Sequence, residues 1–285
     1  MLYQKMSGSR CSRIPVAAIK LLLCLGTHGL LPSQAGATYI YTLADANASA
    51  RIDVSSQTGL RDWTVDGQDR LNQEWFCYRI GSAGPEASID TISCPAVVQQ
   101  TASTLKTTYA NNRISIQVLY SLTGGSSGSG AASVSEQIQI RNLAGHALDF
   151  QFFEYADLDF PGTTQLEQDP AGLFNEAFVN GSGSSVSDTL DTEISPGANH
   201  GVAGLGTLCQ LNDPVPTTFA DHPGPSPNAG WTLEWDSAIA AKGTLLLTQV
   251  MNFDSLPVPE PSVLSLMLLG LAGFSSFLKR SCFRT

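Results

Sequence analysis

Acidic and aromatic side chains are interspersed along the run Leu148–Phe160, which reads LDFQFFEYADLDF. In a strand, alternate residues point to opposite faces, so the apolar residues at the even-numbered positions predict a core-facing side. The other side carries Phe153, Tyr155, Asp157 and Asp159. Aromatic rings beside carboxylates are groups that could contact a ligand, and this face is the first candidate site.

Several interpretations of this face remain open. Asp157 and Asp159, with Glu167 and Asp169 nearby in the sequence, could bind calcium, which prefers clustered carboxylate oxygens. The rings could instead stack on sugars while the acids accept hydrogen bonds from hydroxyl groups. A third interpretation is a glycosidase pair formed by Glu154 and Asp157, which requires a suitable separation and a cleft. The simplest interpretation is a strand at the edge of a sheet with solvated acids.

Glu154 itself falls on the core-facing side of the run. A buried carboxylate needs a hydrogen-bonding partner or a raised pKa.

Other reactive residue types do not form recognisable sites. The letters GGSSG at Gly124–Gly128 match a nucleophile elbow, but they lie in a glycine- and serine-rich turn between two predicted strands. His146, His200 and His222 are too far apart in the sequence for the usual zinc spacing, and there is no Cys-x-x-Cys or phosphate-binding glycine loop. We therefore predict no cofactor other than the calcium alternative, and a protein without enzymatic activity.

The central part of the chain is predicted to be all-β. Period-two alternation recurs in Arg113–Leu122, Val134–Arg141 and Trp231–Asp236, with turn residues between the runs. The apolar run at 243–253 is expected to be a central strand, and the proline-rich segment Asn212–Gly230 a long loop. These features predict one antiparallel β-sandwich over residues 38–256.

Charge is distributed unevenly along the chain. Residues 38–261 hold all 25 acidic residues and eight basic residues, a net charge of −17. Such a domain repels nucleic acid and anionic lipid, which excludes a nucleic-acid partner. Its expected partners are cations, neutral polymers or basic proteins.

The N-terminus has the parts of a secretory signal peptide. A basic region ends at Lys20, an apolar stretch of about eleven residues follows, and a small-residue site contains Ala35 and Ala37. We predict a signal peptide over residues 1–37 that engages the Sec machinery and is cleaved by signal peptidase after Ala37.

Export implies an oxidising compartment, where disulfides persist. The exported part keeps Cys77, Cys94 and Cys209. Cys77 and Cys94 are the natural pair, and closing that loop would contribute roughly 3 kcal/mol. Three unpaired thiols are the alternative, and the sequence does not decide between the two.

The C-terminus carries a short hydrophobic segment. Ser262–Leu278 is 17 residues without a charge, and as a helix it would span roughly 26 Å, at the short end for a membrane crossing. The basic residues Lys279, Arg280 and Arg284 follow and predict a cytoplasmic end.

Val258, Pro259, Glu260 and Pro261, followed by a short apolar helix and a basic cluster, resemble the PEP-CTERM sorting signal. That resemblance covers about 27 residues and implies a Gram-negative bacterium that makes extracellular polysaccharide. It also implies a membrane-bound processing enzyme of the exosortase type as a partner. An uncleaved single-pass anchor is the alternative.

A second stretch, from WTVDGQDRLNQEWFCYRIG through EASID, resembles a recurring ectodomain of PEP-CTERM proteins. In that ectodomain an aromatic residue usually follows the Trp-Phe pair, where this chain has Cys77. The departure indicates a substituted core position and weakens the Cys77–Cys94 disulfide hypothesis.

The expected organisation is a signal peptide (1–37), a β-sandwich ectodomain (38–256) and a sorting segment (257–285). The sorting segment comprises the motif 258–261, a transmembrane helix 262–278 and a basic tail 279–285. We expect an exported, non-enzymatic protein, held in the inner membrane until it reaches the cell surface or extracellular matrix, and associated with exopolysaccharide. The alternatives are a polysaccharide-acting hydrolase or lyase and a calcium-dependent carbohydrate-binding module.

Overall fold

The computed structural model describes residues 39–182 and 187–255. The predicted signal peptide with Ala35 and Ala37, the motif Val258–Pro261, the helix 262–278 and the basic tail 279–285 lie outside the described residues. Within the described part, no helix has the length and apolar character needed to cross a membrane.

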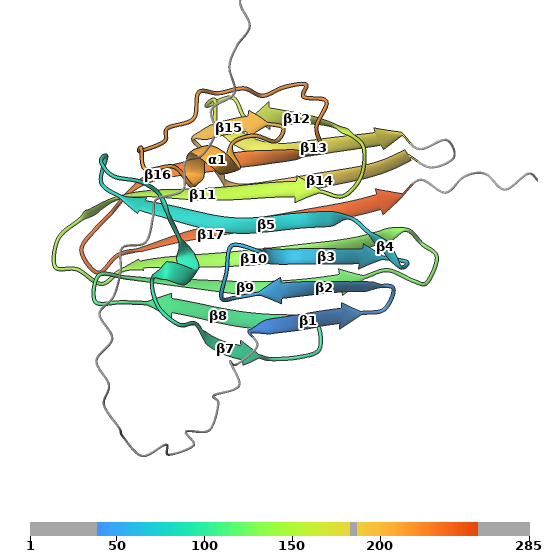
Figure 1. Cartoon of the computed structure of the whole chain (residues 1–285), viewed down its shortest axis with the longest axis horizontal. Coiled ribbons are helices and arrows are strands. Elements are labelled where there is room, and N and C mark those ends of the chain that lie inside the picture. Colours follow the sequence, from blue (N-terminus) through green and yellow to red (C-terminus); the bar gives the residue numbers. More distant parts are fainter. Residues whose placement is uncertain (1–38, 183–186, 256–285) are drawn as a thin grey trace, which may run out of the picture. The chain divides into compact units, whose positions relative to one another are not determined.

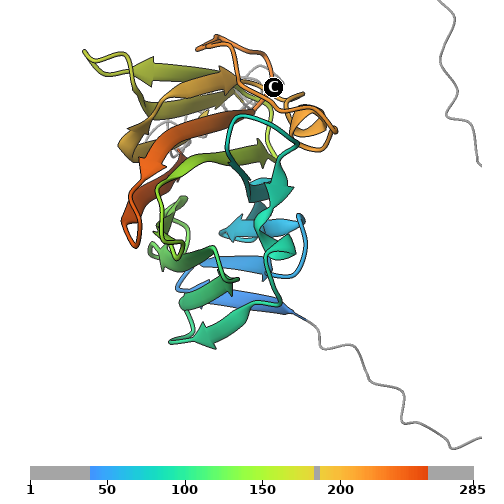
Figure 2. The same ribbon diagram turned by 90° about the vertical axis from the view of Figure 1, so that its left-hand side faces the viewer.

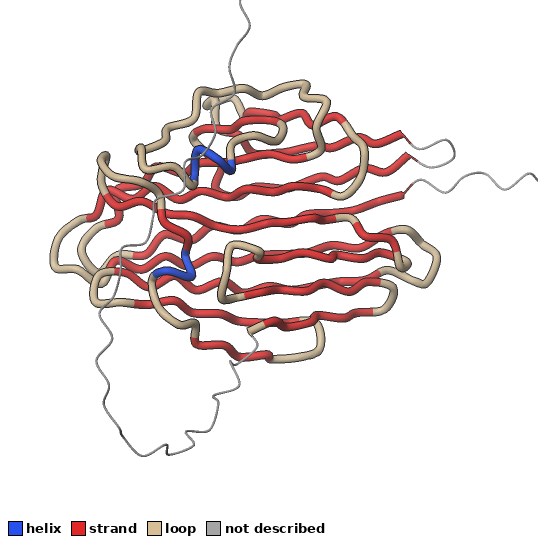
Figure 3. The backbone as a smooth tube through the Cα atoms, viewed as in Figure 1, coloured by secondary structure: helices blue, strands red, loops and turns tan. Residues whose placement is uncertain are grey.

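Two antiparallel sheets pack face to face to form a β-sandwich, as Figures 1 and 2 show. The prediction of an all-β sandwich is confirmed. Among the described residues, helix is confined to a 3₁₀ turn at Ile89–Thr91 and to α1 (Leu208–Leu211) (Figure 3).

The first sheet, called sheet A here, has the strand order β1-β2-β3-β5-β11-β16-β15, and the short strands β4 and β6 pair with β3 and β5. Its long strands β5, β11 and β16 are neighbours in this sheet. The bounds are β1 Ile40–Asp45, β2 Ala48–Asp53, β3 Gly59–Val65, β4 Gln68–Asp69, β5 Leu71–Ile80, β6 Ala87–Ser88, β11 Leu148–Leu158, β15 His200–Ala203 and β16 Gly230–Ile239.

The second sheet, sheet B, has the order β12-β13-β14-β17-β10-β9-β8-β7. The strand expected to be central does lie inside the sheet, because β17 pairs with β14 on one side and β10 on the other. The bounds are β7 Ala96–Gln99, β8 Thr104–Ala110, β9 Ile114–Gly124, β10 Ala131–Asn142, β12 Thr163–Gln168, β13 Phe174–Ser182, β14 Ser187–Ala198 and β17 Thr244–Ser255.

The core lies between the inner faces of the sheets and is rich in aromatic residues. Phe76 of β5 stacks on Phe152 of β11 with ring centroids 5.4 Å apart, and Trp63 of β3 meets Phe253 of β17 edge to face. Each large apolar side chain buried in this way stabilises the fold by about 1.5–3 kcal/mol relative to exposure. The alternation seen in the sequence arises because only one side of each strand faces this core.

The last strand ends beside the turn that joins β9 to β10. The backbone N–H of Ser255 donates to the carbonyl oxygen of Gly130 over 3.0 Å. Gly130 has φ +68, and a Cβ at this position would lie 1.8 Å from Ser255 Oγ, so only glycine fits. The glycine-rich turn thus closes tightly on the end of β17, immediately before the residues of the predicted sorting segment.

Candidate functional site

Residues 204–229, called the strap here, cross the outer face of sheet A between β15 and β16. Leu211 and Phe219 of the strap pack on Cys77, Phe153 and Tyr155 in a second hydrophobic cluster, separate from the main core. The rings of Phe219 and Phe153 meet edge to face with centroids 6.1 Å apart. The strap therefore covers side chains of β5 and β11 that would otherwise face solvent.

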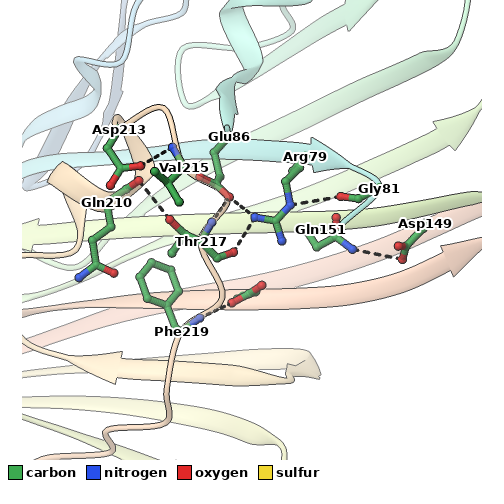
Figure 4. A network of polar contacts seen from close by, with 11 residues as sticks. Arg79, Gly81, Glu86, Asp149, Gln151, Gln210, Asp213, Val215, Thr217 and Phe219 are labelled. Carbon is green, nitrogen blue, oxygen red and sulfur yellow. Dashed lines mark hydrogen bonds and ion pairs between the residues drawn. The ribbon is translucent and has the colours of Figure 1, made fainter. Parts of the chain in front are cut away.

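A buried ion pair fastens the strap to sheet A (Figure 4). The guanidinium of Arg79, on β5, pairs with the carboxylate of Glu86, and the two side chains are only 5% and 0% exposed. Arg79 Nη1 also donates to the carbonyl oxygen of Thr217 over 2.6 Å, while the Thr217 N–H donates to Glu86 Oε1 over 2.8 Å. The two charged groups thus pair with each other and form hydrogen bonds with the strap backbone. A buried ion pair needs such additional hydrogen bonds.

A second carboxylate holds the strap further along. The N–H of Phe219 donates to Glu234 Oε2, on β16, over 2.9 Å. Burial raises the pKa of Glu234 to about 7, although the hydrogen bond from Phe219 opposes the shift. At neutral pH this anchor is therefore close to its titration midpoint.

Some polar atoms beneath the strap have no hydrogen-bond partner among the described residues. They are Glu86 Oε2, Gln151 Oε1 and Glu234 Oε1. The strap thus closes over polar groups whose hydrogen-bonding capacity is only partly used.

The open ligand face expected from Leu148–Phe160 is not present. Phe153 is 0% exposed and Tyr155 is 5% exposed, because the strap lies over both rings. Asp157 is half-buried and Asp159 is exposed. Burial raises the pKa of Asp157, and the hydrogen bond from Asn72 opposes that shift. The interpretation in which these two rings stack on a sugar is therefore wrong for this structure.

The calcium alternative gains no support from the geometry. Among the described residues, no group of three or more His, Cys, Asp or Glu side chains has the arrangement of a metal site. This includes the neighbourhood of Asp157 and Asp159.

A cluster of carboxyl groups lies inside the sandwich, between the sheets. Glu74 on β5, Glu136 on β10 and Glu154 on β11 are 1%, 0% and 0% exposed. Gln249 on β17 joins two of them, since its Nε2 donates to Glu74 Oε1 over 2.6 Å and to Glu136 Oε2 over 2.5 Å. Trp231 Nε1 donates to Glu154 Oε1 over 3.1 Å.

Burial keeps these carboxyl groups protonated at higher pH than usual. It raises the pKa of Glu136 to about 7 and that of Glu154 to about 8, and Glu74, which also faces both other carboxyls, is shifted well upward. One oxygen of each carboxyl lacks a donor in the described structure. A proton on one group would supply a donor to its neighbour, so the cluster is best satisfied when partly protonated.

The sequence prediction for Glu154 is confirmed as far as its burial and raised pKa are concerned. The proposed pairing of Glu154 with Asp157 is not, because Glu154 faces the interior of the sandwich and Asp157 lies on the outer side of the same strand. Two groups on opposite faces of a sheet cannot flank one glycosidic bond.

Glu136 and Gln249 were missed, although the sequence held a signal for both. Each occupies an inward position of an alternating strand, between Val134 and Ile138 in one case and between Leu247 and Met251 in the other. A polar residue at such a position is buried, and it needs a partner on another strand.

The cysteines are free in the described structure. Cys77 is buried in the cluster under the strap, whereas Cys94 and Cys209 are exposed. Of the two alternatives that the sequence left open, the Cys77–Cys94 disulfide is absent from the described structure, and three unpaired thiols are present. Cys77 does occupy a packed position, as its place after Trp75 and Phe76 indicated.

Comparison with known proteins gives matches of shape only. No protein-family model and no curated protein matches the sequence. Among solved structures, the chain is similar to a candidate aldose 1-epimerase from Escherichia coli K12, with a TM-score of 0.48, 12% identity, and coverage of 76% of this chain and 99% of that chain. For a galactose mutarotase-like protein from Lactobacillus casei ATCC 334 the TM-score is 0.47 and the identity is 10%. The match covers 75% of this chain and 99% of that chain. For a candidate kojibiose phosphorylase from the human microbiome the TM-score is 0.46 and the identity is 9%. The match covers 85% of this chain and 33% of that chain.

Proposed function

We propose that this protein is an exported, non-enzymatic component of the bacterial cell surface or extracellular matrix. The Sec machinery and signal peptidase would deliver it, and its C-terminal segment would hold it in the inner membrane. An exosortase-type enzyme of a PEP-CTERM system would then process that segment, and the sandwich would associate with exopolysaccharide.

The observation that carries the proposal is the order of features after β17. Only two residues separate Ser255 from the motif Val258–Pro261, and an uncharged run of 17 residues and a basic cluster follow. Three residue steps lead from Ser255 to Val258, and they span at most roughly 11 Å. The processing motif would therefore lie next to the folded domain. A membrane-bound enzyme would have to bind the motif with almost no linker between it and the domain.

Charge also supports a temporary stay at the membrane. The part between the two targeting segments has a net charge of −17, from 25 acidic and eight basic residues. Anionic lipid head groups repel such a domain. A hydrophobic segment of marginal length would be its main attachment, so removal of that segment would release it.

The geometry of the acids weighs against the hydrolase alternative. Glu154 is enclosed between the sheets, and the strap covers Phe153 and Tyr155. The two acids named for catalysis lie on opposite faces of β11, with Glu154 in the interior and Asp157 on the outer side. Nothing in the arrangement of the described residues favours the calcium alternative.

The test is the intact mass of the mature protein, recovered from the cell envelope and from the medium of the native host. For the wild type we expect a species that begins after Ala37 and ends near Pro261. For the variant Glu260→Ala we expect a species that still ends at Thr285 and stays in the envelope.

Glu167→Ala is the matched control, because Glu167 is an exposed glutamate on β12, outside the motif. It should be processed like the wild type. A wild-type protein that ends at Thr285 in both fractions, or a Glu260→Ala variant processed normally, would show that the sorting proposal is wrong.

A further inference from the structure

The outer face of sheet B differs in chemistry from the rest of this acidic domain. Residues that point outward from β9, β10 and β17 are mostly hydroxyl and amide side chains, with no aromatic ring among them. The outward residues are Ser115, Gln117, Leu119, Ser121 and Thr123 on β9, Ser133, Ser135, Gln137, Gln139 and Arg141 on β10, and Thr244, Leu246, Thr248, Val250, Asn252 and Asp254 on β17.

A hollow of about 270 Å³ lies in the middle of this face. Its lining includes three glutamines, Gln117, Gln137 and Gln139, together with Leu119, Leu246 and Thr248. The volume is slightly below the range of about 300–1,000 Å³ that is typical of small-molecule pockets. Leu246 is 60% exposed, one of the few large apolar side chains exposed in the described structure.

The sheet register sets the spacing of the amides. Gln117 and Gln139 are directly opposite each other on β9 and β10, so their Cα atoms are about 4.5–5.5 Å apart. Gln137 follows on the same face about 6.8 Å along the strand and lies opposite both Leu119 and Thr248. These separations are comparable with the width of a pyranose ring.

The three glutamine amides are available for an external partner. Among the described residues, these three side chains have no hydrogen bond to another part of the chain. Each amide offers two donor hydrogens and an acceptor oxygen, the same mixed capacity that sugar hydroxyls present. The exposed methyl groups of Leu246 offer a surface for the C–H face of a ring.

Charge disfavours a polyanionic ligand. The eight lining residues carry no charge, and the cations beside the hollow on this face are Lys106, across from Leu119 on β8, and Arg141, two positions after Gln139 on β10. Two cations do not offset a net charge of −17 on the surrounding domain, which repels polyanions. Protein partners favour aromatic anchors, which the face lacks.

We propose that the outer face of β9, β10 and β17 binds an uncharged polysaccharide, with one sugar ring seated in the hollow between Gln117, Gln139 and Leu246. This inference rests on the proposed association with exopolysaccharide and names the surface and the charge class of the glycan.

The test is affinity electrophoresis of the full-length chain in detergent micelles, through gels that contain dextran, galactomannan, xyloglucan or the exopolysaccharide of the host. At least one of the three neutral polymers should retard the protein, and the host polymer should do so if its sugars carry no charge. The double variant Gln117→Ala/Gln139→Ala should bind about tenfold more weakly, the effect expected when two hydrogen-bonding groups are removed. Alginate, a polyanion, should not retard either protein.

The matched control is Gln100→Ala/Gln165→Ala, which removes two exposed glutamine amides that lie outside β9, β10 and β17. It should bind like the wild type, and thermal unfolding should show that both double variants are folded. Three outcomes would overturn the proposal: no retardation by any neutral or host polymer, equal retardation of the two double variants, or retardation by alginate. Self-association lost in Gln117→Ala/Gln139→Ala would also overturn it, since the face would then join two copies of this chain.

The binding test and the sorting test can fail independently. The variant Gln117→Ala/Gln139→Ala keeps the motif Val258–Pro261, so its mature mass should match that of the wild type. Normal processing without binding would remove the glycan proposal only. Binding without processing would remove the sorting proposal only.

Discussion

Gln249 of β17 donates a hydrogen bond of 2.6 Å to Glu74 of β5, across the interior of the sandwich. The same amide nitrogen donates to Glu136, so one side chain connects two carboxyl groups on different sheets. A polar link at this depth replaces apolar packing between the layers. Its contribution to stability depends on the protonation of the acids, because an unpaired buried charge is costly.

The first prediction concerns stability against pH. The folded-state pKa values of Glu136 and Glu154 are about 7 and about 8, above the ordinary value of 4.5. The folded state then binds more protons than the unfolded state between those limits, so stability falls as pH rises. We expect the free energy of unfolding, measured with urea, to be greatest near pH 4.5, to decline through pH 7, and to go on declining past pH 8, because burial also raises the pKa of Glu74 well above its ordinary value.

Glu154→Gln tests the origin of this slope. Glutamine keeps an acceptor for Trp231 but cannot ionise, so the decline should be shallower and the variant more stable than the wild type at pH 9. Glu167→Gln makes the same chemical change on an exposed residue and should leave the slope unchanged. A wild-type protein whose stability rises from pH 5 to pH 8 would contradict the protonated cluster.

The second prediction concerns the fastening of the strap. Glu86→Gln leaves the buried guanidinium of Arg79 without its counter-charge, which typically costs about 3–5 kcal/mol. Urea unfolding should show this loss, and protease cleavage within residues 204–229, mapped by mass spectrometry, should become faster. Asp62→Asn is the control, since it breaks an ion pair with Arg51 whose side chains are 44% and 37% exposed and should cost less than about 1 kcal/mol. Equal losses in the two variants would rule out the buried pair as the fastening point.

The third prediction concerns Cys77. Burial raises the pKa of this thiol to about 12, so the reactive thiolate is scarce, and the strap blocks access. Iodoacetamide should label Cys94 and Cys209 in the native protein but spare Cys77, as shown by peptide mass mapping. Phe219→Ala removes the ring that covers Phe153 and should increase the labelling rate of Cys77. A peptide that joins Cys77 to Cys94 would refute the free-thiol structure.

The strands could be predicted because each has one side facing the core. Alternation in Arg113–Leu122 and Val134–Arg141 corresponds to β9 and β10, and the more apolar last run corresponds to the interior strand β17. The inward position of Glu154 followed from the same pattern. The alternation of apolar and polar residues within one strand depends only on neighbouring positions, so it can be detected in a single sequence.

The site could not be predicted in the same way, because it depends on contacts between distant segments. The strap covers Phe153 and Tyr155 through Leu211 and Phe219, more than fifty positions away in the sequence. Alternation assigned the two rings to the outer face correctly, but it cannot show that a proline-rich loop returns to bury that face. The partnership of Gln249 with Glu74 is equally non-local, since it depends on how the two sheets are stacked.

The position of β17 has a mechanical consequence. The strand is paired with β10 from Arg141↔Thr244 to Ala131↔Asp254 and with β14 along its second half, so both of its edges are held. A pull on the chain beyond Ser255, directed along the strand, would load these ladders in shear, with many hydrogen bonds resisting together. A terminal strand at the edge of a sheet could instead be peeled away one bond at a time. Because β17 lies inside the sheet, the domain would bear tension applied at Ser255 without being peeled apart strand by strand.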